Sequence, residues 1–500
     1  MEMIDNLALG FSHSLALHNI AYCFVGALLG TAIGVLPGLG PLATIAMLLP
    51  LTFSLDPISA LIMLAGIYYG AQYGGSTTAI LVNLPGENSS VVTAIDGYQM
   101  ARQGRGGAAL ATAALASVLA GVIATFFIAG FSPILAKAAL SFKSPEYFSL
   151  MIVGLFAAVI LANGSIIKAI GMVVIGLILG TVGTDLNSGA NRFTFGLLNL
   201  MSGLEFVAIS MGLFAFAEIM SNVAQKASAK TDLHKVSRLW PSKQDFRYGT
   251  PAALRGTMLG SVLGILPGGG AALASFSAYS LEKKVARDPS QFGKGAIQGV
   301  AGPEAANNAA AQTSFIPMLT LAIPSNGVMA LMMGAMMVHN IVPGPMILTQ
   351  NAPMFWALVT SMLIGNVILV LLNLPLVGLW VKLISVPYTV LYPAILMFCL
   401  IGLYGIENSS FNVYVAAVFG LLGFMLYRLK CEPAPLLLGF ILGPLLEENL
   451  RRSLLLSKGD FTIFVDRPIS LALLLLAAVL LLSTMMPSFR KKRDEAFAEE

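Results

Sequence analysis

Two short glycine- and proline-containing segments carry the residue types that could hold an ion inside a membrane. Residues 30–40 and 260–270 match at six of eleven positions, and each contains a GxxxG pair followed by Leu-Pro-Gly-x-Gly. Proline removes a backbone donor and glycine permits unusual conformations, so each segment should interrupt an apolar helix. N–H groups at a half-helix start can hold an anion, and freed carbonyl groups can hold a cation. The alternative is that each GxxxG pair only packs two helices.

Uncharged polar side chains gather downstream of each segment. Residues 73–86 and 307–326 are both rich in small and polar residues, then become apolar, and then reach a second proline. Such side chains can coordinate Na⁺ or hydrogen-bond a carboxylate, although Ser and Thr in membrane helices more often bond their own backbone. We predict substrate contacts from the residues around both breaks, namely Gly38, Leu39, Gly40, Ser76, Thr77, Asn83, Pro85, Gly86, Gly268, Gly269, Gly270, Ser325 and Asn326. We predict a coupling-ion site from Asn307, Asn308, Thr313 and Ser314.

Four carboxylates, Glu87, Asp96, Glu205 and Glu304, lie in or beside apolar runs. An intramembrane carboxylate is by default a candidate for function. Glu205 could relay protons or pair with a partner chain, and a structural hydrogen bond between helices explains it equally well. Glu87 and Asp96 could simply lie at an interface. Arg255 aside, no basic residue lies deep in an expected span, so backbone groups and helix ends should hold an anionic substrate.

These residues need membrane helices to position them. The chain has 500 residues, of which 57% are hydrophobic and only 10% are charged, whereas a soluble domain carries about 25% charged residues. Residues 106–136 and 305–381 contain no Asp, Glu, Lys or Arg. We therefore expect an all-α polytopic membrane protein with about 12 transmembrane helices, at about 20 apolar residues each, plus re-entrant or broken helices.

A basic segment at 226–248 divides the chain into two halves. The positive-inside rule predicts a first membrane repeat at 1–225, a cytoplasmic linker at 226–250, a second repeat at 251–488 and a cytoplasmic tail at 489–500. The N-terminal region is acidic and is expected on the periplasmic side.

Loop charges indicate that the two halves have opposite orientations. Between its two breaks the first half carries only Asp56, whereas the second carries four Lys or Arg residues between 283 and 294. After the second break the bias reverses, with Arg102 and Arg105 in the first half and no formal charge at 338–352 in the second. Two inverted-topology repeats explain this pattern. A parallel repeat with charges placed by chance is the alternative, and Lys137 and Lys143 count towards it.

The sequence contains few signals for an enzyme or a bound cofactor. Its four histidines show no HExxH or other paired spacing, and there is no GxSxG, Walker A or dinucleotide motif. Three scattered cysteines make neither a disulfide framework nor a metal site. We expect no cofactor beyond a coupling Na⁺ or H⁺, no other metal and no nucleic-acid partner. Two rival functions remain: a membrane-embedded enzyme acting on a lipid-linked substrate through Glu205 and Glu304, and a passive channel.

Four segments together resemble the large membrane subunit, of TctA type, of the tripartite tricarboxylate transporter family. They are 34–41, 69–78, 83–86 and 264–271, and the resemblance extends over essentially the whole chain. It implies a multi-pass protein of the bacterial inner membrane that is not an enzyme. It also implies two partners, a small membrane subunit of TctB type and a periplasmic solute-binding protein of TctC type.

The function implied is import of organic carboxylates by a secondary transporter. The substrate would be a tricarboxylate such as citrate, or a related di- or monocarboxylate, and a Na⁺ or proton gradient would drive alternating access. The two Pro-Gly breaks and the two polar clusters would then meet near the middle of the bilayer.

Overall fold

The structure is a computed structural model that describes residues 2–36, 39–161, 165–185, 187–224, 239–266, 270–384, 386 and 388–485. Three of the predicted site residues, Gly38, Gly268 and Gly269, lie outside the described residues. So do residues 226–238 of the predicted linker and the whole of the predicted tail.

Helices make up nearly all of the described first half, because apolar runs alternate with proline and glycine at the helix ends. Its helices are α1 (Glu2–Ser14), α2 (Leu17–Gly34), α3 (Pro41–Leu48), η1 (Leu49–Thr52), α4 (Pro57–Val82), α5 (Asn88–Arg102), α6 (Gly106–Ala139), α7 (Ser144–Leu161), α8 (Ile166–Gly180), η2 (Leu198–Leu200), α9 (Phe206–Ser210), the π-helix η3 (Met211–Phe216) and α10 (Ala217–Ala224). Two short strands, β1 (Gly183–Thr184) and β2 (Asn191–Arg192), pair antiparallel between α8 and η2.

The described second half is entirely helices and their connections. Its helices are α11 (Lys243–Ile265), α12 (Gly270–Val285), η4 (Pro289–Gln291), α13 (Gln298–Thr313), α14 (Phe315–Leu321), α15 (Gly327–Val338), α16 (Ile347–Gln350), α17 (Ala352–Asn373), α18 (Val377–Ile384), α19 (Tyr388–Glu407), α20 (Ser410–Arg428), α21 (Ala434–Leu456), α22 (Ile463–Asp466) and α23 (Pro468–Met485). Five stretches in the described residues are long and apolar enough to cross a membrane, and shorter apolar helices accompany them. The chain is therefore a multi-pass helical membrane protein, and the count of 12 spans stays a prediction.

Helix α2 lies directly against α4, and glycine makes this contact possible. A methyl group at Gly30 would overlap the carbonyl oxygen of Ile67, and Gly26 and Gly34 meet the α4 backbone in the same way. The contacts advance along both helices together, so α2 and α4 run parallel. Helix α3 and η1 therefore bring the chain back to the start of α4, and α2, the break and α3 form a hairpin.

The same arrangement recurs between α11 and α13 in the second half. Three α11 glycines meet the α13 backbone, and a methyl group at Gly260 would overlap the carbonyl oxygen of Ala306. These helices are also parallel, and α12 returns the chain to the start of α13. The contacts in the two halves correspond residue by residue, as Gly26–Met63, Gly30–Ile67 and Gly34–Ala71 in the first and Gly256–Gly302, Gly260–Ala306 and Gly264–Ala310 in the second. Both GxxxG pairs therefore pack two helices together, and a functional role for the breaks that follow them stays a prediction.

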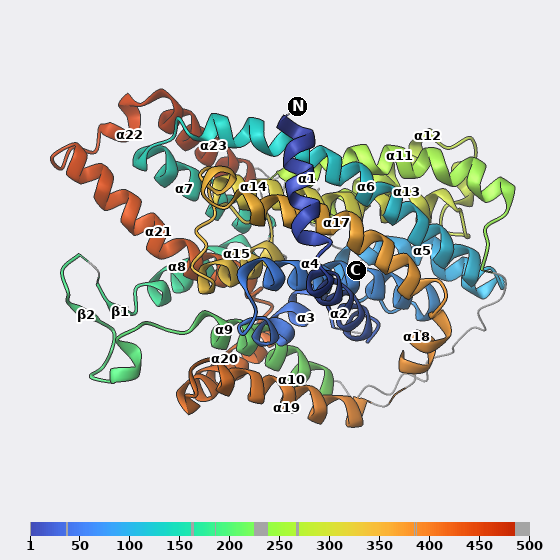
Figure 1. Ribbon diagram of the computed structural model, residues 1–500, viewed down its shortest axis with the longest axis horizontal. Coiled ribbons are helices and arrows are strands. Elements are labelled where there is room, and N and C mark those ends of the chain that lie inside the picture. The colour runs from blue at the N-terminus through green and yellow to red at the C-terminus, as the bar shows by residue number, and fades with distance from the viewer. Residues whose placement is uncertain are drawn as a thin grey trace.

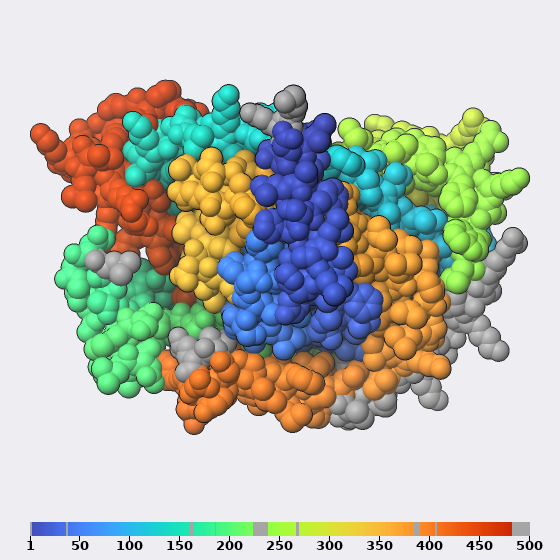
Figure 2. All heavy atoms as spheres, in the orientation of Figure 1, coloured from blue at the N-terminus to red at the C-terminus, as the bar shows by residue number. Residues whose placement is uncertain are grey.

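The helices of the two hairpins lie at the centre and on one side of the molecule. Figure 1 shows α6, α11, α12 and α13 side by side, with α2, α3 and α4 next to them and α19 and α20 along the lower edge. Helix α1 lies on the outside of the face in view, where its atoms form a ridge (Figure 2). It packs on α17, with Gly10 against the backbone of Trp356.

The close parallel packing predicts that Gly260→Ile destabilises the protein. The added side chain would meet backbone atoms that cannot move aside, and overpacking typically costs about 1–3 kcal/mol. The midpoint of thermal unfolding in detergent would report this loss. Gly130→Ala is the matched control, because nothing lies within 4 Å of the new Cβ. An unchanged midpoint for Gly260→Ile would contradict the packing described here.

Candidate functional site

The second break of each half has the same backbone form. The C-cap of α4 is Asn83, whose φ of 55° is left-handed, and the C-cap of α14 is Ala322, whose φ is 56°. After the proline, Glu87 is the N-cap of α5 and Asn326 is the N-cap of α15. The Asn326 side chain accepts a hydrogen bond from the Met329 N–H at 2.9 Å. A left-handed turn, a proline and an extended N-cap therefore interrupt both halves at equivalent positions.

Each hairpin contacts the other half of the chain. Helix α3 of the first hairpin packs on α15, and α12 of the second hairpin packs on α5. Similarly, α4 of the first half contacts α17 of the second, and α13 of the second half contacts α6 of the first. Leu42, at the start of α3, lies beside Gly327, at the start of α15. The helix starts after breaks in different halves are thus neighbours.

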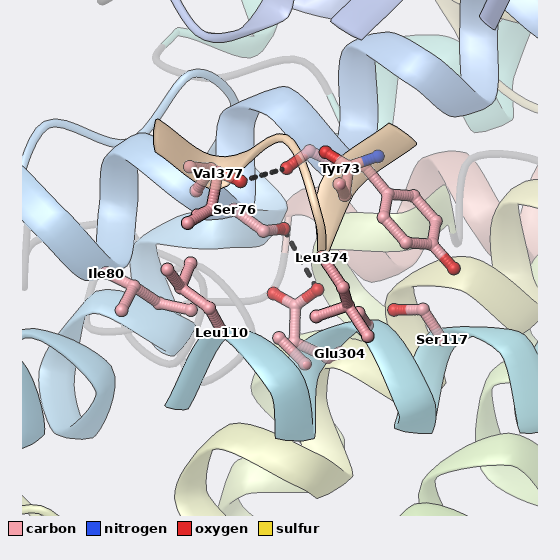
Figure 3. A pocket seen from close by; sticks show the side chains of 12 residues that line it. Tyr73, Ser76, Ile80, Leu110, Ser117, Glu304, Leu374 and Val377 are labelled. Carbon is pink, nitrogen blue, oxygen red and sulfur yellow. Dashed lines mark hydrogen bonds between the residues drawn. The ribbon is translucent and has the colours of Figure 1, made fainter. Parts of the chain in front are cut away.

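Glu304 is the buried carboxylate where the two halves meet. It lies on α13 and is 1% exposed. Its Oε2 accepts a hydrogen bond from Ser76 Oγ at 2.9 Å, and its Oε1 accepts one from Thr93 Oγ1 at 2.5 Å. A cavity of about 20 Å³ adjoins it, lined also by Tyr73 and Ser117. Figure 3 shows Ser76, Glu304 and Ser117 around this cavity.

Two asparagines continue this network along α13. Asn307 Nδ2 donates to Glu87 Oε1 at 3.1 Å, which ties α13 to the N-cap of α5. Asn308 Nδ2 donates to Ser117 Oγ at 2.6 Å and to the Glu304 carbonyl oxygen at 3.1 Å. The structure therefore brings Asn307, Asn308 and Ser76 together around Glu304.

Other predicted site residues make local bonds. Ser76 and Thr77 also donate to their own helix backbone, as do Thr313 and Ser314, which bond Ala309 and Ala311. Ser325 is buried, and its hydroxyl has no hydrogen-bond partner among the described residues. Leu39 is fully buried, and Gly270 begins α12 with a φ of 51°.

The two breaks of the first half lie close together, and glycines occupy the points of contact. The added Cβ of an alanine at Gly86 would lie 2.7 Å from the Gly75 Cα and 3.2 Å from the Gly34 carbonyl oxygen. Gly40, the N-cap of α3, is close to the Gly86 carbonyl. Gly40 and Gly86, both predicted site residues, therefore lie together, with Pro85 in the same turn.

The sequence analysis missed a carboxylate at this point. Glu218, in the first turn of α10, lies near the Gly40 backbone. It follows directly on the π-helix η3, a rare form that occurs frequently at functional sites. Its position within an apolar run was the signal that could have found it. Glu205, by contrast, caps α9 by accepting from the Val207 N–H at 2.7 Å.

Asp96 fastens α5 to the second half. Its Oδ1 accepts hydrogen bonds from the N–H groups of Gly293, Gly295 and Ala296 at 2.8–2.9 Å. Its Oδ2 accepts one from the Tyr279 hydroxyl at 3.0 Å. Asp96 therefore joins the first half of the chain to the second.

Charged and polar groups lie near the hydrogen bonds of Asp96. Arg105 pairs with Asp245, and Gln103 Nε2 donates to the Lys294 carbonyl oxygen at 2.8 Å. Burial would raise the pKa of Asp245, but hydrogen bonds from Ser242 and Arg105 outweigh burial and hold that pKa below its usual value. The start of α11 and the end of α12 line a cleft of about 810 Å³ here, together with Arg105. The segment before α4 has different surroundings. The ring of Phe53, the C-cap of η1, lies 6.3 Å from the ring of His339, measured between centroids.

The fold and this buried polar network define a multi-pass helical membrane protein with interrupted helices at its core. The model of the tripartite tricarboxylate transporter TctA family matches residues 20–438, and the chain belongs to this family. The suspected resemblance is thereby confirmed. The family is a transporter family, and its name implies a system of three components.

Two similar proteins come from Agrobacterium vitis. An uncharacterized 52.8 kDa protein in the TAR-I ttuC' 3' region is 57% identical over 500 residues, which covers 100% of both chains. An uncharacterized protein in the TAR-II ttuC' 3' region is 57% identical over 241 residues, which is 48% of this chain and 100% of that protein. No solved structure matches.

The contacts of Asp96 predict that Asp96→Asn loosens the loop at 293–296. The amide can accept at only one atom and loses the charge, and a hydrogen bond to a charged group is typically worth about 1.5–3 kcal/mol. Hydrogen exchange measured by mass spectrometry should show faster exchange of the amides of Gly293, Gly295 and Ala296. Asp5→Asn, at an exposed position on α1, is the control. Unchanged protection in Asp96→Asn would contradict the fastening role.

Proposed function

We propose that the chain is the large membrane subunit of a binding-protein-dependent secondary transporter that imports organic carboxylates. A small membrane subunit of TctB type and a periplasmic binding protein of TctC type would complete the system in the bacterial inner membrane. A Na⁺ or proton gradient would drive uptake. Membership of the TctA family supports the transporter class and the two partners.

The pair of matching hairpins is the observation that carries this proposal. The start of α11 and the end of α12, which are the two ends of the second hairpin, lie beside basic residues that include Arg105. The ends of the α2–α3 hairpin lie at the start of α4, where Ser59 Oγ donates to Asn19 Oδ1 at 2.6 Å. Helix α4, of 26 residues, separates Asp56 from the second break. These contacts favour two inverted repeats whose half-helices converge from opposite faces, as in other transporters.

The surroundings of Gly40 support a carboxylate as the substrate. The α3 N-terminus points backbone N–H groups and a positive dipole end at an anion. The carboxylate of Glu218 lies near Gly40, so this chemical group has room beside the N-cap of α3. An incoming carboxylate would bind the free N–H groups there, and the equivalent segment of the second half, residues 268–270, would supply the other half of the site.

The size of the Glu304 cavity supports alternating access. At about 20 Å³ it exceeds the roughly 10–15 Å³ that one water needs, and it is far below the 300–1,000 Å³ typical of small-molecule pockets. The carboxylate would therefore bind elsewhere, at the breaks, in a conformation that opens them. The hairpins and the helices that they contact would move together to expose the breaks to each side in turn.

Uptake by the reconstituted system tests this function. Proteoliposomes that contain the chain and its two partners should accumulate a carboxylate against its gradient when an inward Na⁺ or proton gradient is imposed. Collapsing that gradient should abolish accumulation, because no nucleotide-binding motif offers another energy source. Uptake that is indifferent to both gradients, or that only equilibrates the substrate, would refute the proposal in favour of a passive channel.

A further inference from the structure

The cavity beside Glu304 has the composition of a cation site. Four elements line it: α4, α6, α13 and the connection from α17 to α18. Its polar lining is formed by Tyr73, Ser76, Thr77, Ser117, Glu304 and Asn373. Carboxylate, hydroxyl and amide oxygens are the ligands that hard cations prefer.

Glu304 is a buried carboxyl group with no cationic partner in the described part of the chain. No ion pair among the described residues includes Glu304 or Glu87. The groups that donate to Glu304 are the neutral hydroxyls of Ser76 and Thr93. A buried charge is costly unless it is paired, so the ionised form of this carboxyl group needs a bound cation.

Asn373 shows independently that the cavity accommodates a ligand. Its Nδ2 donates to the Leu369 carbonyl oxygen at 2.8 Å, which fixes the orientation of the amide. The Asn373 side chain lines the cavity, is 6% exposed, and its Oδ1 has no hydrogen-bond partner in the described part of the chain. A proton bound to Glu304 would leave this oxygen unsatisfied, whereas a cation in the cavity would contact both residues.

We infer that this cavity is a Na⁺ site, formed by Glu304, Asn373 and the hydroxyls of Ser76 and Ser117. The volume suits one ion of about the size of a water molecule, and the single carboxylate matches a single positive charge. The amide nitrogens of Asn307 and Asn308, which were predicted as ligands, donate to Glu87 and Ser117 and so help to position the groups beside the cavity.

The site's position explains how ion binding would reach the substrate site, and this step rests on the proposed function. Thr93 bonds Glu304 from the middle of α5, and Asn307, one turn from Glu304, bonds the N-cap Glu87. A Na⁺ ion that draws on the Glu304 oxygens would therefore alter both contacts of α5. The turn at Pro85 and Gly86 precedes this helix directly, so the ion and the break are linked through three side chains.

Direct binding of radiolabelled Na⁺ to the full-length protein in lipid nanodiscs tests the site. We expect saturable binding that unlabelled Na⁺ displaces and choline does not. Glu304→Gln keeps the shape of the side chain but should abolish the binding. Asn373→Ala should weaken it by about tenfold or more, in line with the loss of one supporting group at a metal site. Glu448→Gln removes an exposed charge on α21 and should bind as the unaltered protein does.

Two results would count against the Na⁺ site. Absence of saturable Na⁺ binding in the unaltered protein would overturn it, as would undiminished binding by Glu304→Gln. Thermal unfolding with and without Na⁺ checks that both variants are folded. Since no substrate or gradient is used, Na⁺ binding without carboxylate uptake would refute the proposed function alone. Gradient-driven uptake without Na⁺ binding would refute the site alone.

Discussion

The structure depends on the contact between glycine-bearing hairpins and the long helices beside them. A re-entrant hairpin exposes backbone groups within the bilayer, and each unsatisfied group there costs several kcal/mol. Such a turn is tolerated only when protein surrounds it. The glycines of α2 and α11 allow that approach, because a side chain at Gly30 or Gly260 would collide with the neighbouring backbone. The absence of side chains thus permits α2 and α11 to lie directly against α4 and α13.

The buried polar network follows from this packing. Once α4 and α13 are held against the hairpins, Ser76 and Glu304 meet, and Asn307 reaches Glu87. Each bond joins one half of the chain to the other. In low dielectric such bonds strengthen, and an unpaired member becomes costly, so the network is sensitive to both composition and geometry. The proposed ion site and the proposed carboxylate site would therefore be coupled over a short path.

Much of the architecture could be predicted from the sequence. Composition predicted a helical membrane protein, and the similar segments around Pro85 and Pro324 predicted equivalent second breaks, which have the same left-handed residue at Asn83 and Ala322. The GxxxG packing was also predictable. The roles of Thr93, Ser117 and Asn373 were not, because they depend on which helices become neighbours after folding. Nor was Glu218 at Gly40, which belongs to a helix far away in the sequence.

The predicted cation ligands Asn307 and Asn308 were chosen for their type. Their amide nitrogens donate to Glu87 and Ser117, whereas Asn307 Oδ1 has no hydrogen-bond partner among the described residues, and their role as ligands stays a prediction. Thr313 and Ser314 bond their own helix, as hydroxyl residues in membrane helices commonly do. Glu304 was noted for its charge alone, and only the folded chain shows the oxygen atoms that surround it.

The central claim is that the two hairpins enter the membrane from opposite faces, and cysteine labelling tests it most directly. Single cysteines at Ser54 and Lys284, in a protein from which Cys23, Cys399 and Cys431 have been removed, would be exposed to a membrane-impermeant thiol reagent in oriented vesicles. The account predicts labelling of Ser54→Cys from the periplasmic side and of Lys284→Cys from the cytoplasmic side. Labelling of both from the same side would contradict it.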